Sequence, residues 1–173
     1  MDETTLPNGW VLTVGADITA LKHNEKTLRQ AHEAAIAASR TDPLTDLPNR
    51  RRILELLDEA LFGNEASTSG LCVAVIDIDR FKAINDTHGH EAGDAVLRHF
   101  AGTCRERVRS QDVLGRMGGE EFLLVLPGVK AGDGMGLAER VRQGLPPIRL
   151  AEDGISLRYT FSAGIAEAVP KDD

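Results

Sequence analysis

Carboxylates gather at three points of this sequence, each at the end of an apolar run or beside glycine. Asp77 and Asp79 follow the apolar run 71–76, and residues 120–121 are two glutamates directly after the glycine pair 118–119. The third cluster comprises Asp86 and Asp94, which flank Gly89, His90 and Gly93.

A carboxylate at the end of a buried strand, close to a second one on a hairpin, suits a hard cation. Mg²⁺ takes one or two protein carboxylates and completes its shell with water and phosphate oxygens. Gly118 and Gly119 leave room for a ligand to approach the backbone. Phe81 and Lys82 would place amide donors and one ammonium near a phosphate on that metal. The residues therefore predict a metal-dependent phosphate site, and the alternative is a set of solvated turn carboxylates.

The elements expected to position these residues are short strands and amphipathic helices. The apolar run 71–76 predicts a central strand buried on both faces, with Asp77 at its carboxyl end. Residues 113–117 and 122–126 predict a hairpin that turns at 118–119. The other expected elements are a helix from its N-cap Asn49 to Phe62 (Ile53, Leu54, Leu57, Ala60 and Leu61 inward), a polar loop over 63–70, helices over 96–108 and around Ala138, Val141 and Leu145, and a strand from Ile155 to Ile165.

The first 40 residues have a different pattern. Alternating residues around Leu12 predict one strand, and a helix is expected over 18–40, where the sequence has no glycine or proline. Its apolar and small residues repeat as heptads, which favours a two-stranded coiled coil; a single amphipathic helix packed on its own domain is the alternative. Pro43 ends the helix, because the residue before proline avoids helical backbone angles. The heptad positions are Leu21, Asn24, Leu28, Ala31, Ala35 and Ala38.

Composition narrows the classes of function. The chain has 173 residues, a net charge of −7 and two cysteines. The acidic balance argues against a broad DNA-binding surface, although amides, a lysine and a metal can still bind a phosphate ligand. Cys72 and Cys104 are expected to be buried thiols of a reducing compartment, so we expect a cytoplasmic location. No apolar run is long enough for a membrane span, so no direct membrane contact is expected, and an upstream anchor in the parent protein is left open.

Four ordered motifs resemble one known family. Residues 116–122, Arg-Met-Gly-Gly-Glu-Glu-Phe, resemble the signature of GGDEF domains, the diguanylate cyclases, in its GGEEF variant. Residues 41–50 resemble the start of that domain, and residues 77–86 its first active-site motif. Residues 89–94 contain the Gly-His and Gly-Asp pairs of the family, whereas Asp46 stands where the family usually has glycine. The resemblance implies an α+β, palm-like nucleotidyl cyclase fold with a central, mostly antiparallel sheet flanked by helices.

The resemblance also implies an activity. Two GTP molecules would condense to cyclic di-GMP and two pyrophosphates on a homodimer, because each domain holds one GTP. The catalytic residues would be Asp77, Glu120 and Glu121, with Glu121 as a second metal ligand or as base for the 3′-hydroxyl. By position, Asp77, Glu120 and the Ile78 carbonyl would hold Mg²⁺ or Mn²⁺, Asn85 and Asp94 would bind guanine, Phe81 and Lys82 would contact the triphosphate, and Gly119 would admit the nucleotide.

A control site is implied as well. Arg109 and Asp112 form an RxxD pattern just before the signature, where the family has its product-inhibition site. Arg140 is either a second arginine of that site or a solvated helix residue. The alternative function is a catalytically weak or inactive module that binds cyclic di-GMP through this RxxD site.

Three segments are expected along the chain. Residues 1–17 resemble the last strand of a PAS sensory domain, residues 18–40 would be a coiled-coil signalling helix that mediates the homodimer, and residues 41–173 would be the GGDEF domain. The family normally continues with a helix and strand whose lysine and arginine grip the triphosphate. We therefore expect a C-terminally truncated domain, whose own activity the sequence leaves open together with the input signal.

Overall fold

The structure is a computed structural model that describes residues 2–5, 9, 11–14, 19–38, 40–62, 70–150, 154 and 156–168. The chain divides into two compact units, residues 1–39 and residues 40–173. Within the described ranges, every helix is too short or too polar to cross a bilayer.

The first unit contains a hairpin and one long helix. Strands β1 (Asp2–Thr5) and β2 (Val11–Val14) pair antiparallel, and α1 covers Thr19–Ala38. The sequence predicted β2 and the helix but missed β1, whose residues Asp-Glu-Thr-Thr lack apolar alternation. Leu21 and Leu28 of α1 are 66% and 73% exposed, so their apolar surface is uncovered in a single chain.

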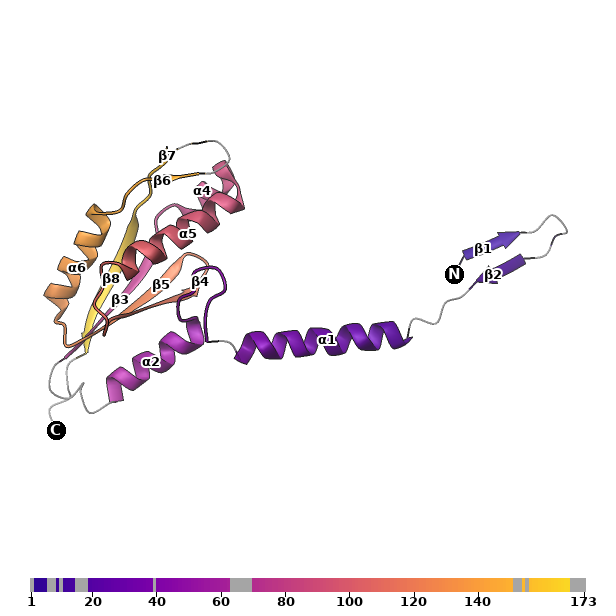
Figure 1. Cartoon of the computed structure of the whole chain (residues 1–173), viewed down its shortest axis with the longest axis horizontal. Coiled ribbons are helices and arrows are strands. Elements are labelled where there is room, and N and C mark those ends of the chain that lie inside the picture. The colour runs from indigo at the N-terminus through magenta and orange to yellow at the C-terminus, as the bar shows by residue number, and fades with distance from the viewer. Residues whose placement is uncertain are drawn as a thin grey trace. The chain divides into compact units, whose positions relative to one another are not determined.

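The second unit is an α+β domain built on a four-stranded sheet (Figure 1). The strand order is β4-β5-β3-β8, and all three neighbouring pairs are antiparallel. The expected α+β class with a mostly antiparallel sheet is confirmed. The elements are α2 (Arg50–Phe62), β3 (Leu71–Ile78), α4 (Phe81–His88), α5 (His90–Arg105), β4 (Val113–Gly118), β5 (Glu121–Pro127), α6 (Ala131–Gln143), β6 (Ile148–Arg149), β7 (Ser156–Leu157) and β8 (Phe161–Ala168).

Helices cover the two faces of the sheet unequally. On one face, α5 and α6 close the main core, in which the Phe100 ring lies 4.8 Å from that of Phe122 and 5.3 Å from that of Phe161. On the other face, α2 lies over β4 and β5 (Figure 1). Its Ile53 side chain is fully buried against this part of the sheet. Burying these apolar side chains supplies the main driving force for folding.

Three expectations about burial and helix length are wrong. Strand β3 is not buried on both faces, because α2 lies over β4 and β5 and leaves Val75 53% exposed. Leu54 and Leu61 of α2 are 36% and 38% exposed instead of inward. Val108 and Leu145 pack against the main core from beyond the ends of α5 and α6, which stop at Arg105 and Gln143.

Other differences concern the boundaries of elements. The sequence missed α4, whose eight residues bury only Phe81 and Ile84 and so carry almost no periodic signal. The expected strand from Ile155 to Ile165 is divided, since residues 158–160 separate β7 from β8. Ile155 itself and the predicted polar loop, apart from Gly70, lie outside the described residues.

Candidate active site

The turn between β4 and β5 depends on two glycines. Gly118 and Gly119 have φ values of 137° and 54°, backbone conformations that side chains disfavour. A Cβ added at either position would meet no heavy atom within 4 Å. Conformation, not crowding, therefore requires glycine here, and the space beside the turn is open to a ligand.

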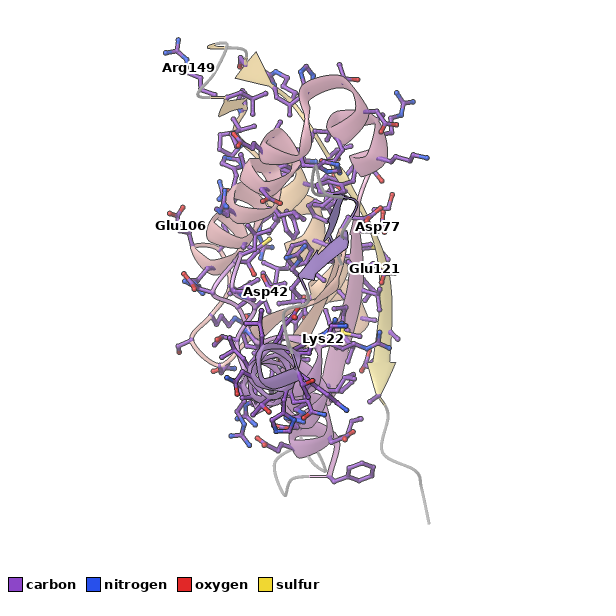
Figure 2. The ribbon with its side chains drawn as sticks, turned by 90° about the vertical axis from the view of Figure 1, so that its right-hand side faces the viewer. Lys22, Asp42, Asp77, Glu106, Glu121 and Arg149 are labelled. Carbon is purple, nitrogen blue, oxygen red and sulfur yellow. The ribbon has the colours of Figure 1, made fainter. Side chains whose placement is uncertain are left out.

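This turn brings two glutamates to the end of β3. Asp77 of β3 is the register partner of Glu121 of β5, and both side chains lie at one end of the sheet (Figure 2). The Ile78 amide donates a hydrogen bond of 3.3 Å to the Glu120 carbonyl, which holds the turn beside the strand. Asp77 and Glu121 are thus neighbours across the two strands, and Glu120 lies beside them in the turn, while their catalytic roles remain a prediction.

The surroundings of Asp77 disfavour its charged form. Partial burial raises the pKa of Asp77, and the charges of Glu120, Glu121 and Asp79 raise it further. Asp79 is bonded to the segment around the start of β8: its carboxylate accepts a 2.7 Å hydrogen bond from Ser162, and its amide donates to the Thr160 carbonyl.

A hard divalent cation fits this set of donors. Among the described residues, no group of three or more His, Cys, Asp or Glu side chains is placed to hold a metal ion by itself. Mg²⁺ does not need one, because it binds through one or two carboxylates and fills its shell with water and phosphate oxygens. A cation here would also relieve the repulsion around Asp77.

A helix contact places the two residues expected to bind guanine. A Cβ at Gly93 of α5 would overlap the Asn85 Oδ1 atom and lie 3.1 Å from the Phe81 ring, so α4 can approach this closely only because residue 93 is glycine. Asp94 follows directly and keeps a half-exposed carboxylate. Lys82 is exposed, whereas the Phe81 ring is buried. Phe81 would therefore contact a phosphate through its backbone N–H at the start of α4 and not through its ring.

Comparison with known proteins shows which family this sequence belongs to. The sequence profile described as "Diguanylate cyclase, GGDEF domain" matches residues 39–173. The chain belongs to this family. It is 38% identical to diguanylate cyclase DgcP of Pseudomonas aeruginosa over 86% of this chain and 22% of that protein. It is 36% identical to response regulator PleD of Caulobacter vibrioides over 84% of this chain and 33% of that protein.

Solved structures agree with the assignment. The GGDEF domain of DgcB from Caulobacter crescentus, determined in complex with c-di-GMP, superposes with a TM-score of 0.72 at 33% identity, covering 76% of this chain and 79% of that one. Diguanylate cyclase SiaD of Pseudomonas aeruginosa, in complex with its activator SiaC, gives 0.69 at 36% identity, covering 89% and 59%. The chain spans about a fifth to a third of the length of the curated relatives named above.

An ion pair that sequence reasoning missed anchors the GGDEF turn. The Arg116 guanidinium donates to both carboxylate oxygens of Asp42 at 3.1 Å, and it also donates to the Gly119 carbonyl at 3.1 and 2.8 Å. The Arg116 amide donates to the Pro48 carbonyl at 2.9 Å. Asp42 and Arg116 both lie inside motifs that the sequence singled out, but 74 positions separate them and no local signal pairs them.

The RxxD residues of this GGDEF domain form a tight local turn. The Asp112 carboxylate accepts a 2.8 Å hydrogen bond from the Arg109 amide through Oδ2, while its Oδ1 atom is buried without a partner among the described residues. The Arg109 side chain is exposed, and Arg140 is exposed on a different element, α6. The structure therefore shows Arg109 and Asp112 together and gives no contact that joins Arg140 to them.

Proposed function

We propose that this chain is the cyclase domain of a diguanylate cyclase, which condenses two GTP into cyclic di-GMP and two pyrophosphates. The proposal rests on the register pairing of Asp77 with Glu121, with Glu120 next to them in the open glycine turn. The relatives named as diguanylate cyclases support it. The GGEEF form of the signature keeps a carboxylate at both catalytic positions.

Each residue then has a chemical task. Asn85 and the Asp94 carboxylate would recognise guanine, because a carboxylate accepts hydrogen bonds from both the ring N–H and the amino group. Asp77, Glu120 and the Ile78 carbonyl would hold Mg²⁺ or Mn²⁺, which when bound offsets charge on the α-phosphate. The 3′-hydroxyl of one GTP attacks the α-phosphate of the other, and pyrophosphate leaves. Glu121 is the candidate acceptor of the hydroxyl proton, or a second ligand to the metal.

The test is product formation from GTP with Mg²⁺, followed by chromatography. Glu120→Gln is expected to lower the rate by about 100-fold or more, because it removes charge that the metal requires. Glu106→Gln is the matched control, since Glu106 is an exposed carboxylate in the turn after α5 (Figure 2). Equal rates for Glu120→Gln and the unchanged chain would refute the assignment. A folded chain without turnover would favour the second function.

The second candidate function is binding of cyclic di-GMP without turnover, or feedback inhibition in an active enzyme. The exposed Arg109 side chain at the Asp112 turn supports it, because an arginine guanidinium binds phosphate oxygens and stacks on planar rings. The GGDEF domain of DgcB, determined in complex with c-di-GMP, supports this choice of ligand. Calorimetry should show that the unchanged chain and the Arg105→Ala variant bind cyclic di-GMP and that the Arg109→Ala variant does not. Equal binding by both variants would contradict a binding site at Arg109.

We also propose that α1 is a coiled-coil signalling helix that brings two cyclase domains together. Its exposed Leu21 and Leu28 are one heptad apart, and Asn24 occupies the seam between them. The hairpin before α1 would be the end of a PAS domain. Sedimentation should show a dimer that becomes monomeric with Leu21→Glu and Leu28→Glu together, whereas Lys22→Glu with Arg29→Glu should leave a dimer.

A further inference from the structure

A hollow of about 750 Å³ lies beside α4, away from the proposed guanine residues. Ile84 and His88 line it from one face of α4, because positions four apart lie above one another on a helix, and Arg80 lines it from the residue just before that helix. The segment between β7 and β8 lines the other side through Arg158 and Tyr159. Asn85 belongs to a different face of α4 and contacts α5 instead. The hollow is therefore separate from the contact that places Asn85.

Positive charge converges on this hollow although the chain is acidic overall. Arg80 and Arg158 are exposed, and neither guanidinium makes a hydrogen bond or ion pair with another described residue. His88 is half-buried at the same wall. The one carboxylate of the lining, Asp79, accepts a hydrogen bond from Ser162, outside the lining set. The lining thus holds two guanidinium groups against one carboxylate, so positive charge remains for a ligand.

The wall also has an apolar part, in which the tyrosine ring is held in place. The Tyr159 hydroxyl lies 2.7 Å from His99 Nδ1, and the two rings meet edge to face at 5.7 Å, which fixes the tyrosine ring. Ala83 and Ile84 supply aliphatic surface. Arg80 sits in the left-handed region, with φ 57° and ψ 30°. A non-glycine residue there is uncommon, and such positions are often found where the backbone serves a ligand site.

We propose that this hollow, the Arg80/Arg158 pocket, binds a small organic anion. A phosphate or carboxylate group would lie between the two guanidinium groups, which match the planar or branched oxygens of either. A flat apolar portion would lie against Tyr159 and Ile84. Because α4 also carries Asn85, an occupant of the pocket would contact the same helix that positions the proposed guanine site.

Calorimetry with phenyl phosphate and benzoate tests the proposal. Binding of phenyl phosphate alone identifies a phosphoryl pocket, and binding of both identifies a general anion pocket. Arg158→Gln should weaken binding by about tenfold or more, corresponding to the loss of a charge-assisted bond. Ala83→Trp should block binding sterically without removing charge. Arg149→Gln is the matched control, because Arg149 is an exposed arginine outside the lining (Figure 2).

Three results would overturn the proposal. The first is no binding of either probe by the folded chain. The second is equal weakening by Arg158→Gln and Arg149→Gln, which would indicate non-specific attraction to surface arginines. The third is displacement of the bound probe by GTP in proportion to GTP occupancy, which would make the pocket part of the nucleotide site. Circular dichroism confirms that each variant is folded before binding is measured.

Discussion

Replacing Asp42 should destabilise the domain and loosen the GGDEF turn between β4 and β5. The chain reaches Asp42 four residues after α1 ends at Ala38, so this residue joins the start of the domain to the candidate active site. Its carboxylate accepts two hydrogen bonds from Arg116, and Oδ1 also accepts from the Thr45 amide at 2.9 Å and hydroxyl at 2.8 Å. Asp42→Asn keeps an acceptor for Thr45 but removes the charge that pairs with Arg116.

The size of the effect follows from burial. The side chains of Arg116 and Asp42 are only 14% and 18% exposed. Removing one partner of a fully buried pair costs about 3–5 kcal/mol, and a surface pair contributes about 0–1 kcal/mol. For this largely buried pair we expect a loss of about 2–3 kcal/mol in the free energy of unfolding. Glu139→Gln is the control, because Glu139 pairs with Arg142 at 2.7 Å on the solvated surface.

The effect should depend on pH with a definite sign. Burial alone would raise the pKa of Asp42, but hydrogen bonds from Thr45 and Arg116 and the Arg116 charge together lower it below its ordinary value of 3.8. A carboxyl whose pKa is lowered by folding stabilises the folded state above its unfolded pKa, and this stabilisation is lost as pH falls through the folded value. The difference between the unchanged chain and Asp42→Asn should therefore be constant from about pH 5 to 7 and shrink below about pH 4.

Urea denaturation followed by far-ultraviolet circular dichroism measures the stability. Hydrogen exchange at Gly119 and Glu120 measures the turn, which should exchange faster in Asp42→Asn because Arg116 loses its anchor. The reasoning is refuted if Asp42→Asn costs no more than Glu139→Gln and leaves exchange at the turn unchanged.

Three further outcomes are expected. Asp46→Gly should raise the free energy of unfolding by about 0.5–1 kcal/mol in urea, since Asp46 has φ 56° and relief of left-handed strain exceeds the entropy that glycine adds to the unfolded chain; a loss of stability would contradict this. Mg²⁺ at about tenfold above its Kd should raise the Tm of the unchanged chain and of the Glu106→Gln variant by about 3 °C or more. The Tm of the Asp77→Asn variant should rise much less, and equal shifts in all three proteins would show that the cation binds elsewhere. Burial raises the pKa of Cys104 to about 12 and also raises that of Cys72, so a thiol-exchange reagent at about pH 8 should label neither until urea unfolds the chain.

Local signals predicted part of this fold correctly. The glycine pair predicted the β4–β5 turn, where both φ values are positive. Asn49 was expected to cap α2, and its Oδ1 atom accepts the Arg52 amide at 3.1 Å. Helix α4 was missed because eight residues with two buried apolar side chains are too few to establish a period. The burial of β3 was overestimated because a run of apolar residues does not say how much of the sheet a helix will cover.

Features that depend only on neighbours within a few residues can be predicted from this sequence directly. The types of the carboxylates, the glycines that the turn requires and the position of Asn49 are all visible in order along the sequence. Contacts between distant segments depend instead on the antiparallel order of the strands and on which helix covers each face. That order pairs Asp77 with Glu121, joins Asp42 to Arg116 and places Arg158 across from α4. A one-residue shift of register would turn Asp77 to the opposite face of the sheet and separate it from Glu121, although every sequence motif would remain unchanged.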